Sequence, residues 1–164
     1  MNLPESLLQI LDNTVLCWSL IACLFAQVSK LFIELIFFQR WRPVVLIETG
    51  GMPSSHSSLI TGITSGLGLE LGFDHPVFAL GVGISLVIMY DASGVRRSAG
   101  LHAVQINKIA NQLNQADKLN LKETLGHSKL EVIVGSILGP LITLSGLKFF
   151  GSPLDIIHSI SRFF

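Results

Sequence analysis

The sequence predicts an all-α protein: a polytopic membrane helical bundle with about four to five membrane helices and one cytosolic or interfacial helix. Of the 164 residues, 49% are hydrophobic and 13% are charged, and the mean hydropathy is +0.61, which is more apolar than soluble chains. The hydrophobic residues gather in runs of about the length that crosses a bilayer. No linker-like stretch divides the chain, so residues 1–164 are expected to form a single membrane-embedded domain.

The first apolar run covers residues 13–29, which carry no charge. A helix of about 17 residues rises about 25 Å, close to the thickness of the hydrocarbon core, and its continuation beyond Lys30 to residue 38 allows tilt. Residues 57–73 are less apolar, but their glycines have the spacing of small residues at close helix contacts. We therefore expect a second, tightly packed span there.

A turn is expected at residues 73–76, because Pro76 disfavours helix at His75 and suits the first turn of the following helix. The third predicted span then covers residues 77–90.

Residues 91–130 are too charged to lie in lipid, although part of this segment has helical periodicity. We expect a cytosolic or interfacial helix within it. Residues 132–150 form the fourth predicted span. The tail, residues 152–164, is amphipathic and is expected either to lie at the membrane interface or to form a short fifth membrane segment.

The distribution of basic residues predicts which side the loops face. Basic residues follow the first span and recur between the third and fourth spans, whereas the 73–76 turn carries no basic residue. The positive-inside rule therefore predicts an integral, multi-pass protein with the loops 39–56 and 91–130 in the cytoplasm. An even number of crossings separates these loops, so they can meet. The formal net charge is zero, which gives no support to nucleic acid as a partner.

The two loops carry the polar groups of a candidate catalytic site. Guanidinium groups and the N–H groups at a helix start suit phosphate oxygens, and two histidines can supply a nucleophile and a proton donor. This chemistry has no metal-ligand set, so no cofactor or metal is expected. The candidates are Arg40, Arg42, Ser54, Ser55 and His56 in the first loop and Arg96, Arg97, His102, His127 and Glu131 in the second.

Four short stretches carry a family resemblance. They are "RP" at 42–43, "PSSH" at 53–56, "VRR" at 95–97 and "HSKLEVIVG" at 127–135. In this order they resemble the three signature motifs of the type 2 phosphatidic acid phosphatase superfamily, which includes the vanadium haloperoxidases. "GGMPSSHS" with "DASGVRR" is similar to its divergent branch of small membrane proteins, the acid phosphatase/vanadium-dependent haloperoxidase-related proteins. The resemblance covers about residues 20–145.

The resemblance implies a membrane enzyme that hydrolyses a phosphomonoester or diphosphate of a membrane lipid through a phosphohistidine intermediate. His127 would match the nucleophile, Glu131 the carboxylate that orients its imidazole, and His56 the acid that protonates the leaving oxygen. Phosphate or vanadate would be the ligand of the site. The residues that would hold it are Arg42, Arg96, Arg97, Ser54, Ser55 and, as a substitute lysine, Lys30.

The third motif departs from the family pattern in its spacing. In the family the histidine stands six positions after the arginine, whereas Arg96 and His127 are 31 apart, so the intervening segment would have to loop out and return. His102 has the short spacing, but Ile106 stands where a carboxylate is expected. Glu131 has that offset from His127, which favours His127 as the nucleophile.

Smaller departures occur elsewhere. Ser55 stands where the second motif usually has glycine, and Glu131 where the third usually has aspartate. Leu35 stands where the first motif has a lysine, for which Lys30 or Arg40 would substitute. These departures leave open a second hypothesis, a non-catalytic membrane protein that retains an anion or lipid-headgroup pocket. The glycine-rich helix faces also suggest a homo-oligomer.

Overall fold

The computed structural model describes residues 5–48, 50–113 and 120–152. The predicted tail from residue 153 onward, with His158, lies outside the described residues. The described chain forms helices and loops, with no strand among its residues. The helices are α1 Glu5–Asp12, α2 Thr14–Phe38, the short 3₁₀ helix η1 Pro43–Leu46, α3 Ser55–Leu71, α4 Pro76–Ser93, α5 Val95–Gln112 and α6 Lys129–Phe149.

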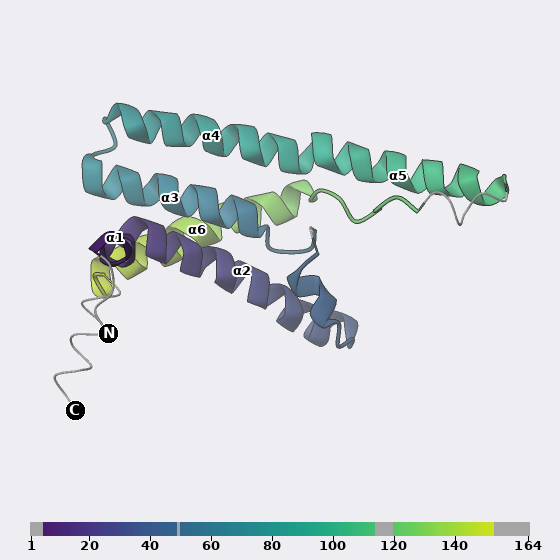
Figure 1. Cartoon of the computed structure of the whole chain (residues 1–164), viewed down its shortest axis with the longest axis horizontal. Helices are drawn as coiled ribbons and strands as arrows, with labels where there is room; N and C mark the ends of the chain where they lie inside the picture. The colour runs from purple at the N-terminus through teal and green to yellow at the C-terminus, as the bar shows by residue number, and fades with distance from the viewer. Residues whose placement is uncertain (1–4, 49, 114–119, 153–164) are drawn as a thin grey trace.

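Helices α2, α3, α4 and α6 lie side by side in one bundle (Figure 1). In the described part of the chain, three helical stretches are long and apolar enough to cross a membrane: α2, α6, and α4 taken together with α5. Helix α3 packs between them along the same axis, and its first turn belongs to the loop end of the bundle. The predicted all-α membrane bundle is thus confirmed. The four predicted span ranges fall on α2, α3, α4 and α6, but α3 is not among the three stretches with the length and hydropathy of a membrane span.

Small residues fill the centre of the bundle, and large ones cover its outside. A Cβ added to Gly139 would collide with the carbonyl oxygen of Ser58, so α3 and α6 approach at backbone distance. The hydroxyls of Ser19 and Thr143 lie 3.5 Å apart in the same region and are fully buried. Exposed side chains such as Leu24 suit contact with lipid, because lipid solvates apolar surface. The glycine-rich faces therefore pack against helices of their own chain.

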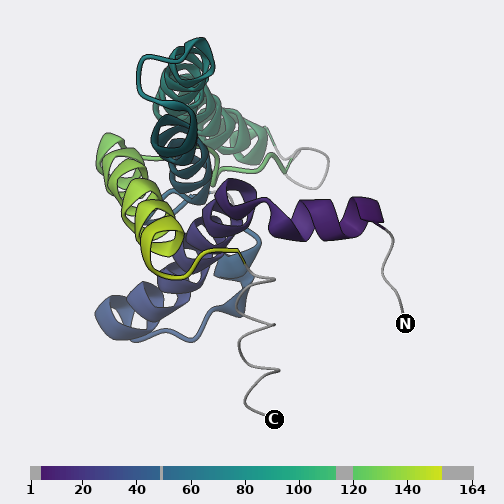
Figure 2. The same cartoon turned by 90° about the vertical axis from the view of Figure 1, so that its left-hand side faces the viewer.

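Helix α1 was not predicted. It runs across the bundle axis at the end that also holds the described C-terminal residues (Figure 2). Asn13 separates it from α2 and caps α2 by accepting a hydrogen bond of 2.9 Å from the N–H group of Leu16. A helix of eight residues is too short to show a span-length apolar run, which is why the hydropathy pattern did not indicate it.

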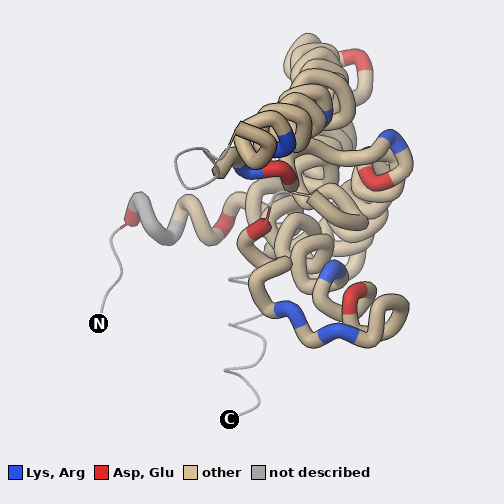
Figure 3. Tube along the Cα trace, turned by 90° about the vertical axis from the view of Figure 1, so that its right-hand side faces the viewer, with Lys and Arg blue, Asp and Glu red and all other residues tan. Residues whose placement is uncertain are grey.

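Helix α5 continues almost in line with α4 after Gly94 and projects beyond the rest of the bundle (Figure 1). The end of α2, the starts of α3 and α6, and the end of α4 all lie at the base of this projection. Several charged residues lie on the loops and helix ends there (Figure 3). The polar chemistry of the described chain is therefore concentrated at one end of an apolar bundle.

Candidate functional site

Two backbone hydrogen bonds connect the start of α6 to its neighbours at the end of the bundle from which α5 projects. The N–H group of His127 donates to the carbonyl oxygen of Ala92 at 2.9 Å, and the N–H group of Ser54 donates to the carbonyl oxygen of Glu131 at 3.0 Å. The first bond ties the start of α6 to the end of α4, and the second ties it to the start of α3. Residues far apart in the sequence are thereby held within one small region.

The chain between the arginine and the histidine of the third motif leaves the bundle along α5 and returns beside it. The side chain of Asn107 donates to the carbonyl oxygen of Leu121 at 2.8 Å and accepts from the N–H group of Leu121 at 2.9 Å. A Cβ on Gly100 would lie 2.8 Å from the carbonyl oxygen of Leu125, so the returning segment lies directly against α5. This return brings His127 back to the base of α5.

The start of α3 is built from serines. Ser54 is fully buried and caps the helix, accepting from the N–H group of Ser57 at 3.4 Å and from its hydroxyl at 3.0 Å. Gly135 of α6 packs against the Ser54 carbonyl oxygen, where a Cβ would clash. This close contact fixes the first turn of α3, with Ser55 and His56, against the first turn of α6.

His127 is held by a carboxylate. Its side chain is 5% exposed, and its Nδ1 lies 2.9 Å from Oε2 of Glu131. The same Glu131 oxygen accepts from the N–H group of Ser128 at 3.2 Å, completing a capping box at the start of α6. An ionised carboxylate only accepts hydrogen bonds, so Nδ1 carries the proton and Nε2 carries the lone pair. The Nε2 atom of His127 is thus available to act as a nucleophile or an acceptor.

A cavity of about 370 Å³ lies where these elements meet. Both motif histidines line it, together with a buried lysine and side chains of α2 and the loop around η1. The lining residues are Leu20, Cys23, Leu24, Gln27, Lys30, Leu46, Ile47, Glu48, Ser55, His56 and His127. The structure therefore brings the second and third motifs to one cavity.

Lys30 is the most buried charged side chain of this site, with 3% exposure. No hydrogen bond or ion pair joins its ammonium group to another described residue. It lines the cavity with the two histidines and also a neighbouring cavity with Glu131. Burying an ammonium group is costly unless a negative partner approaches it. The arrangement suits an anion in the cavity.

His56 lies outside the three candidate membrane spans, and its environment disfavours its charged form. Burial lowers the pKa of His56 below its ordinary value of 6.5, and electrostatic interactions with Arg96, His127 and Lys30 lower that pKa further. His56 is therefore mainly neutral at pH 7 while the cavity holds no anion. An anion would offset the same charges and favour the protonated imidazolium.

The two arginines of "VRR" take different positions. Arg96 pairs with Asp91 at its Nε atom and lies near enough to His56 to affect its pKa. Arg97 instead lines an adjacent cavity of about 300 Å³ with Glu131. Gly126 also lines that cavity, and its φ of +79° and its contact with the Arg97 backbone leave no room for a side chain.

Arg42 lies outside the cavity. Its guanidinium Nη2 is 3.0 Å from Oε1 of Glu48, and its Nη1 is 3.6 Å from Oε1 of Glu34. Arg42 therefore reaches the cavity only through Glu48, which lines it. Ser54 is also not part of the lining, because it is buried beneath the first turn of α3.

The other described histidines lie elsewhere. His102 is exposed on α5 and lines none of the cavities described here. His75 is at the opposite end of the bundle, where its Nδ1 accepts from the N–H group of Val77 at 3.2 Å and caps α4. Of the two alternatives for the nucleophile, the structure places His127 beside His56.

Sequence reasoning missed two polar residues of the cavity, Gln27 and Glu48. After Asn13 at its start, Gln27 is the next amide side chain in the first apolar run, and an amide inside an apolar run is a signal that a polar group faces the bundle interior. Glu48 stands just before the "GGMPSSH" stretch and gave no signal of its own.

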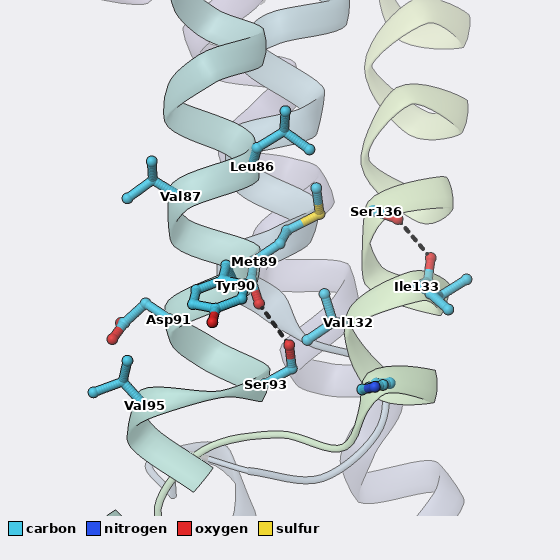
Figure 4. Close-up of a pocket in the computed structure, with 11 residues that line it drawn as sticks. Leu86, Val87, Met89, Tyr90, Asp91, Ser93, Val95, Val132, Ile133 and Ser136 are labelled. Carbon is cyan, nitrogen blue, oxygen red and sulfur yellow. Dashed lines mark hydrogen bonds between the residues drawn. The ribbon is translucent and has the colours of Figure 1, made fainter. Parts of the chain in front are cut away.

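Another hollow, about 780 Å³ in volume, lies between the end of α4 and the start of α6 (Figure 4). Its walls are mainly apolar, with Leu86, Met89 and Val132 among them, and Asp91 and Lys129 also line it. The hydroxyls of Ser93 and Ser136 point back to carbonyl oxygens of their own helices, at 2.9 and 2.8 Å. This groove offers apolar contact and lacks the buried cation of the cavity.

The fold and the site define a multi-pass integral membrane protein with a polar cavity at one end of a helical bundle. Its residues 11–142 match the Divergent PAP2 family, and the chain belongs to this family. The motif resemblance to a divergent branch of the phosphatidic acid phosphatase superfamily is thereby confirmed. The chain is similar to the uncharacterized membrane protein YuiD of Bacillus subtilis (strain 168), with 39% identity over 157 residues, which cover 87% of this chain and 99% of that protein. No solved structure matches the chain.

Proposed function

We propose that the protein is a metal-independent lipid-phosphate phosphatase, which hydrolyses a phosphomonoester or diphosphate of a membrane lipid through a phosphohistidine. One observation carries the proposal: Lys30, His56 and His127 share a single cavity, and Glu131 holds His127 in the tautomer that exposes Nε2. Membership of the Divergent PAP2 family supports phosphatase-like chemistry.

In the first step, Nε2 of His127 attacks phosphorus and forms a P–N bond while the bond from phosphorus to the lipid oxygen breaks. The imidazolium of His56, which the bound phosphate favours, gives its proton to that oxygen, and the lipid leaves as an alcohol. Lys30 stabilises the negative charge on the phosphoryl oxygens, because its ammonium group acts in a site of low polarity.

In the second step, water attacks phosphorus and the P–N bond breaks. The now neutral His56 accepts a proton from the water, and inorganic phosphate is released. Glu131 stabilises the positive charge of the His127 imidazole during both steps, through the hydrogen bond to Nδ1. Each residue thus returns to its starting protonation state.

The position of the cavity supports a lipid as the substrate. Leu20 and Leu24 line it from α2, and these side chains are 49% and 63% exposed on the membrane-facing side of that helix. An acyl or isoprenyl chain can remain in the bilayer while its phosphate occupies the cavity. Cytoplasmic exposure of the site remains the prediction of the positive-inside rule.

The test is phosphate release by the purified protein in detergent, with a chelator present. Phosphatidate, phosphatidylglycerophosphate and isoprenyl diphosphates are the substrates, and His127→Ala and His56→Ala are the variants. We expect turnover of at least one substrate, a loss of about 10³-fold or more in His127→Ala, and a loss of about 10²-fold in His56→Ala. His102→Ala is the matched control and should retain activity. No turnover, or turnover unaffected by both variants, would refute the proposal.

One observation favours a second candidate, a non-catalytic protein that binds a lipid headgroup. Glu48 lines the cavity, and Arg42 is paired with Glu34 and Glu48 and does not line the cavity. Binding of vanadate without turnover would support this candidate. Isolation of a phosphohistidine at His127 would exclude it.

A further inference from the structure

The amide of Gln27 is fixed in one orientation at the cavity wall. Its Nε2 atom donates a hydrogen bond of 2.5 Å to the carbonyl oxygen of Leu46, in η1. A carbonyl oxygen only accepts hydrogen bonds, so the nitrogen must face Leu46 and the oxygen must face the other way. The Oε1 atom is fully buried, and no described residue donates a hydrogen bond to it.

A buried acceptor without a donor is rare in native proteins and calls for an explanation. The nearest turn of α2 offers Lys30, three residues on, but the proposed function uses its ammonium group for the phosphate. Ser55 and His56 also line the cavity and carry groups that can donate, but neither makes a hydrogen bond to Oε1. A donor supplied by the ligand would satisfy it.

The order of side chains along α2 indicates where that donor would lie. Leu20 and Leu24 come first and face lipid, Gln27 follows, and Lys30 comes last. At a rise of about 1.5 Å per residue, Gln27 and Lys30 are separated by about 4.5 Å along the helix axis. An amphiphile that follows the helix would place its chain at the leucines, its phosphate at Lys30 and a donor between the two.

We propose that the cavity selects lipid phosphomonoesters with a free hydroxyl on the carbon next to the phosphoester carbon, and that Gln27 Oε1 accepts its hydrogen bond. This inference rests on the proposed function. A monoacylglycerol phosphate has such a hydroxyl. Isoprenyl diphosphates have none, and in diacylglycerol phosphates an ester has replaced it. Gln27 is thus a residue that determines specificity at the headgroup.

The experiment compares two substrates that differ in one hydroxyl: 1-oleoylglycerol 3-phosphate and its 2-deoxy analogue, 1-oleoylpropanediol 3-phosphate. The value of kcat/KM is measured for each in the same micelles. The wild-type protein is expected to prefer the hydroxyl substrate by about tenfold or more, because a buried polar group left unpaired disfavours the deoxy analogue.

Two variants separate hydrogen bonding from packing. Gln27→Met keeps the length of the side chain but has no oxygen, so the preference should fall to about twofold or less. Gln27→Glu keeps acceptor oxygens, so it should retain the preference while its charge lowers kcat/KM for both substrates. Gln105→Met, at an exposed position of α5, is the control and should behave as the wild type. Because each preference is a ratio within one variant, general damage to the fold cancels.

The outcomes distinguish this inference from the proposed function. Equal hydrolysis of both substrates by the wild-type protein overturns the role of Gln27 and leaves the phosphatase proposal standing. If neither substrate is hydrolysed although phosphatidate, phosphatidylglycerophosphate or an isoprenyl diphosphate is, the selection for a free hydroxyl is overturned and the phosphatase proposal stands. If none of these lipids is hydrolysed, the phosphatase proposal fails, and calorimetric binding of the two monoacyl lipids decides the role of Gln27. Tighter binding of the hydroxyl lipid, lost in Gln27→Met, supports that role, and equal binding overturns it. Should Gln27→Met fail to fold, the wild-type comparison alone decides.

Discussion

Glu131 serves both the helix and the histidine. Its carboxylate completes the capping box of α6 and bonds Nδ1 of His127. The same residue therefore sets where α6 begins and which nitrogen of His127 is free. A glutamate in place of the family's usual aspartate still makes a contact of 2.9 Å, because the extra methylene is accommodated within the first turn of α6.

Glu131→Gln tests this orienting contact. The amide nitrogen can donate to Nδ1, which would favour the tautomer with its lone pair on the wrong nitrogen. We expect kcat to fall by about 10²-fold or more while KM changes little. Phosphate release measures the effect, and thermal unfolding shows whether α6 remains capped. Asp74→Asn, at the opposite end of the bundle, should leave kcat unchanged. An unchanged kcat in Glu131→Gln would remove the orienting role.

His56 should couple anion binding to proton uptake. The pKa of His56 is lowered in the folded protein, chiefly by burial and then by Arg96, so the unfolded chain binds more protons as the pH falls below about 6.5. The free energy of unfolding should therefore decrease as the pH falls through that range. Vanadate in the cavity would offset the positive charges and raise the pKa again.

Calorimetry of vanadate binding at pH 6.5, in buffers of different ionisation enthalpy, measures this uptake. The wild-type protein should take up more protons than the His56→Asn variant, because the asparagine side chain does not titrate. The difference should be as much as about one proton per site. Equal uptake by the two proteins would show that His56 does not sense the anion.

Helices α3 and α6 position the two histidines through glycines. Gly135 and Gly139 of α6 lie against carbonyl oxygens of the first turns of α3. His56 and His127 stand at the starts of these two helices, so their separation depends on how closely the helices approach. Packing in the middle of the bundle thus determines the geometry at its end.

Gly135→Ala should separate the helices. The added methyl group meets the Ser54 carbonyl oxygen, which is backbone and cannot rotate away. We expect a loss of about 1–3 kcal/mol of stability, because overpacked contacts force shifts of backbone, together with a loss of activity. Thermal unfolding in detergent and phosphate release measure the two effects.

Gly83→Ala is the matched control on α4. A Cβ at Gly83 meets nothing within 4 Å, and alanine favours helix over glycine by about 1 kcal/mol. This variant should be as stable as the wild type or more stable, with full activity. Equal behaviour of the two alanine variants would contradict the role of the close contact at Gly135.

Across the whole molecule, the loops that carry the motifs lie at one end of the bundle and the turn before α4 lies at the other (Figure 1). Single cysteines introduced by I47C, K122C and D74C test this arrangement in a background without Cys17 and Cys23. A membrane-impermeant maleimide should label the first two from the same side and the third from the opposite side. If the positive-inside prediction holds, the first two sites react only in inverted vesicles. Labelling of all three from one side would contradict the arrangement.

The sequence predicted the bundle well because each span has its own local signal. Apolar length indicates α2 and α6, glycine spacing indicates α3, and Pro76 marks the start of α4. The arrangement of the cavity has no such signal. The fixed amide of Gln27 depends on a carbonyl of η1, and the pairing of Arg42 depends on Glu48, so both follow from how the loop at 39–56 folds back. Such contacts arise only once the helices have packed.

The return of the chain along α5 has a consequence for how proteins of this kind can vary. His127 is positioned by its bond to Ala92 and by the contacts of residues 120–126 with α5. The number of residues between Arg96 and His127 is therefore not set by the site. Doubling the length of a flexible loop costs only about 0.6 kcal/mol, so insertions and deletions there are tolerable. A sequence pattern that demands a fixed separation between the arginine and the histidine of the third motif would overlook such chains. A criterion based on spatial contacts would find them.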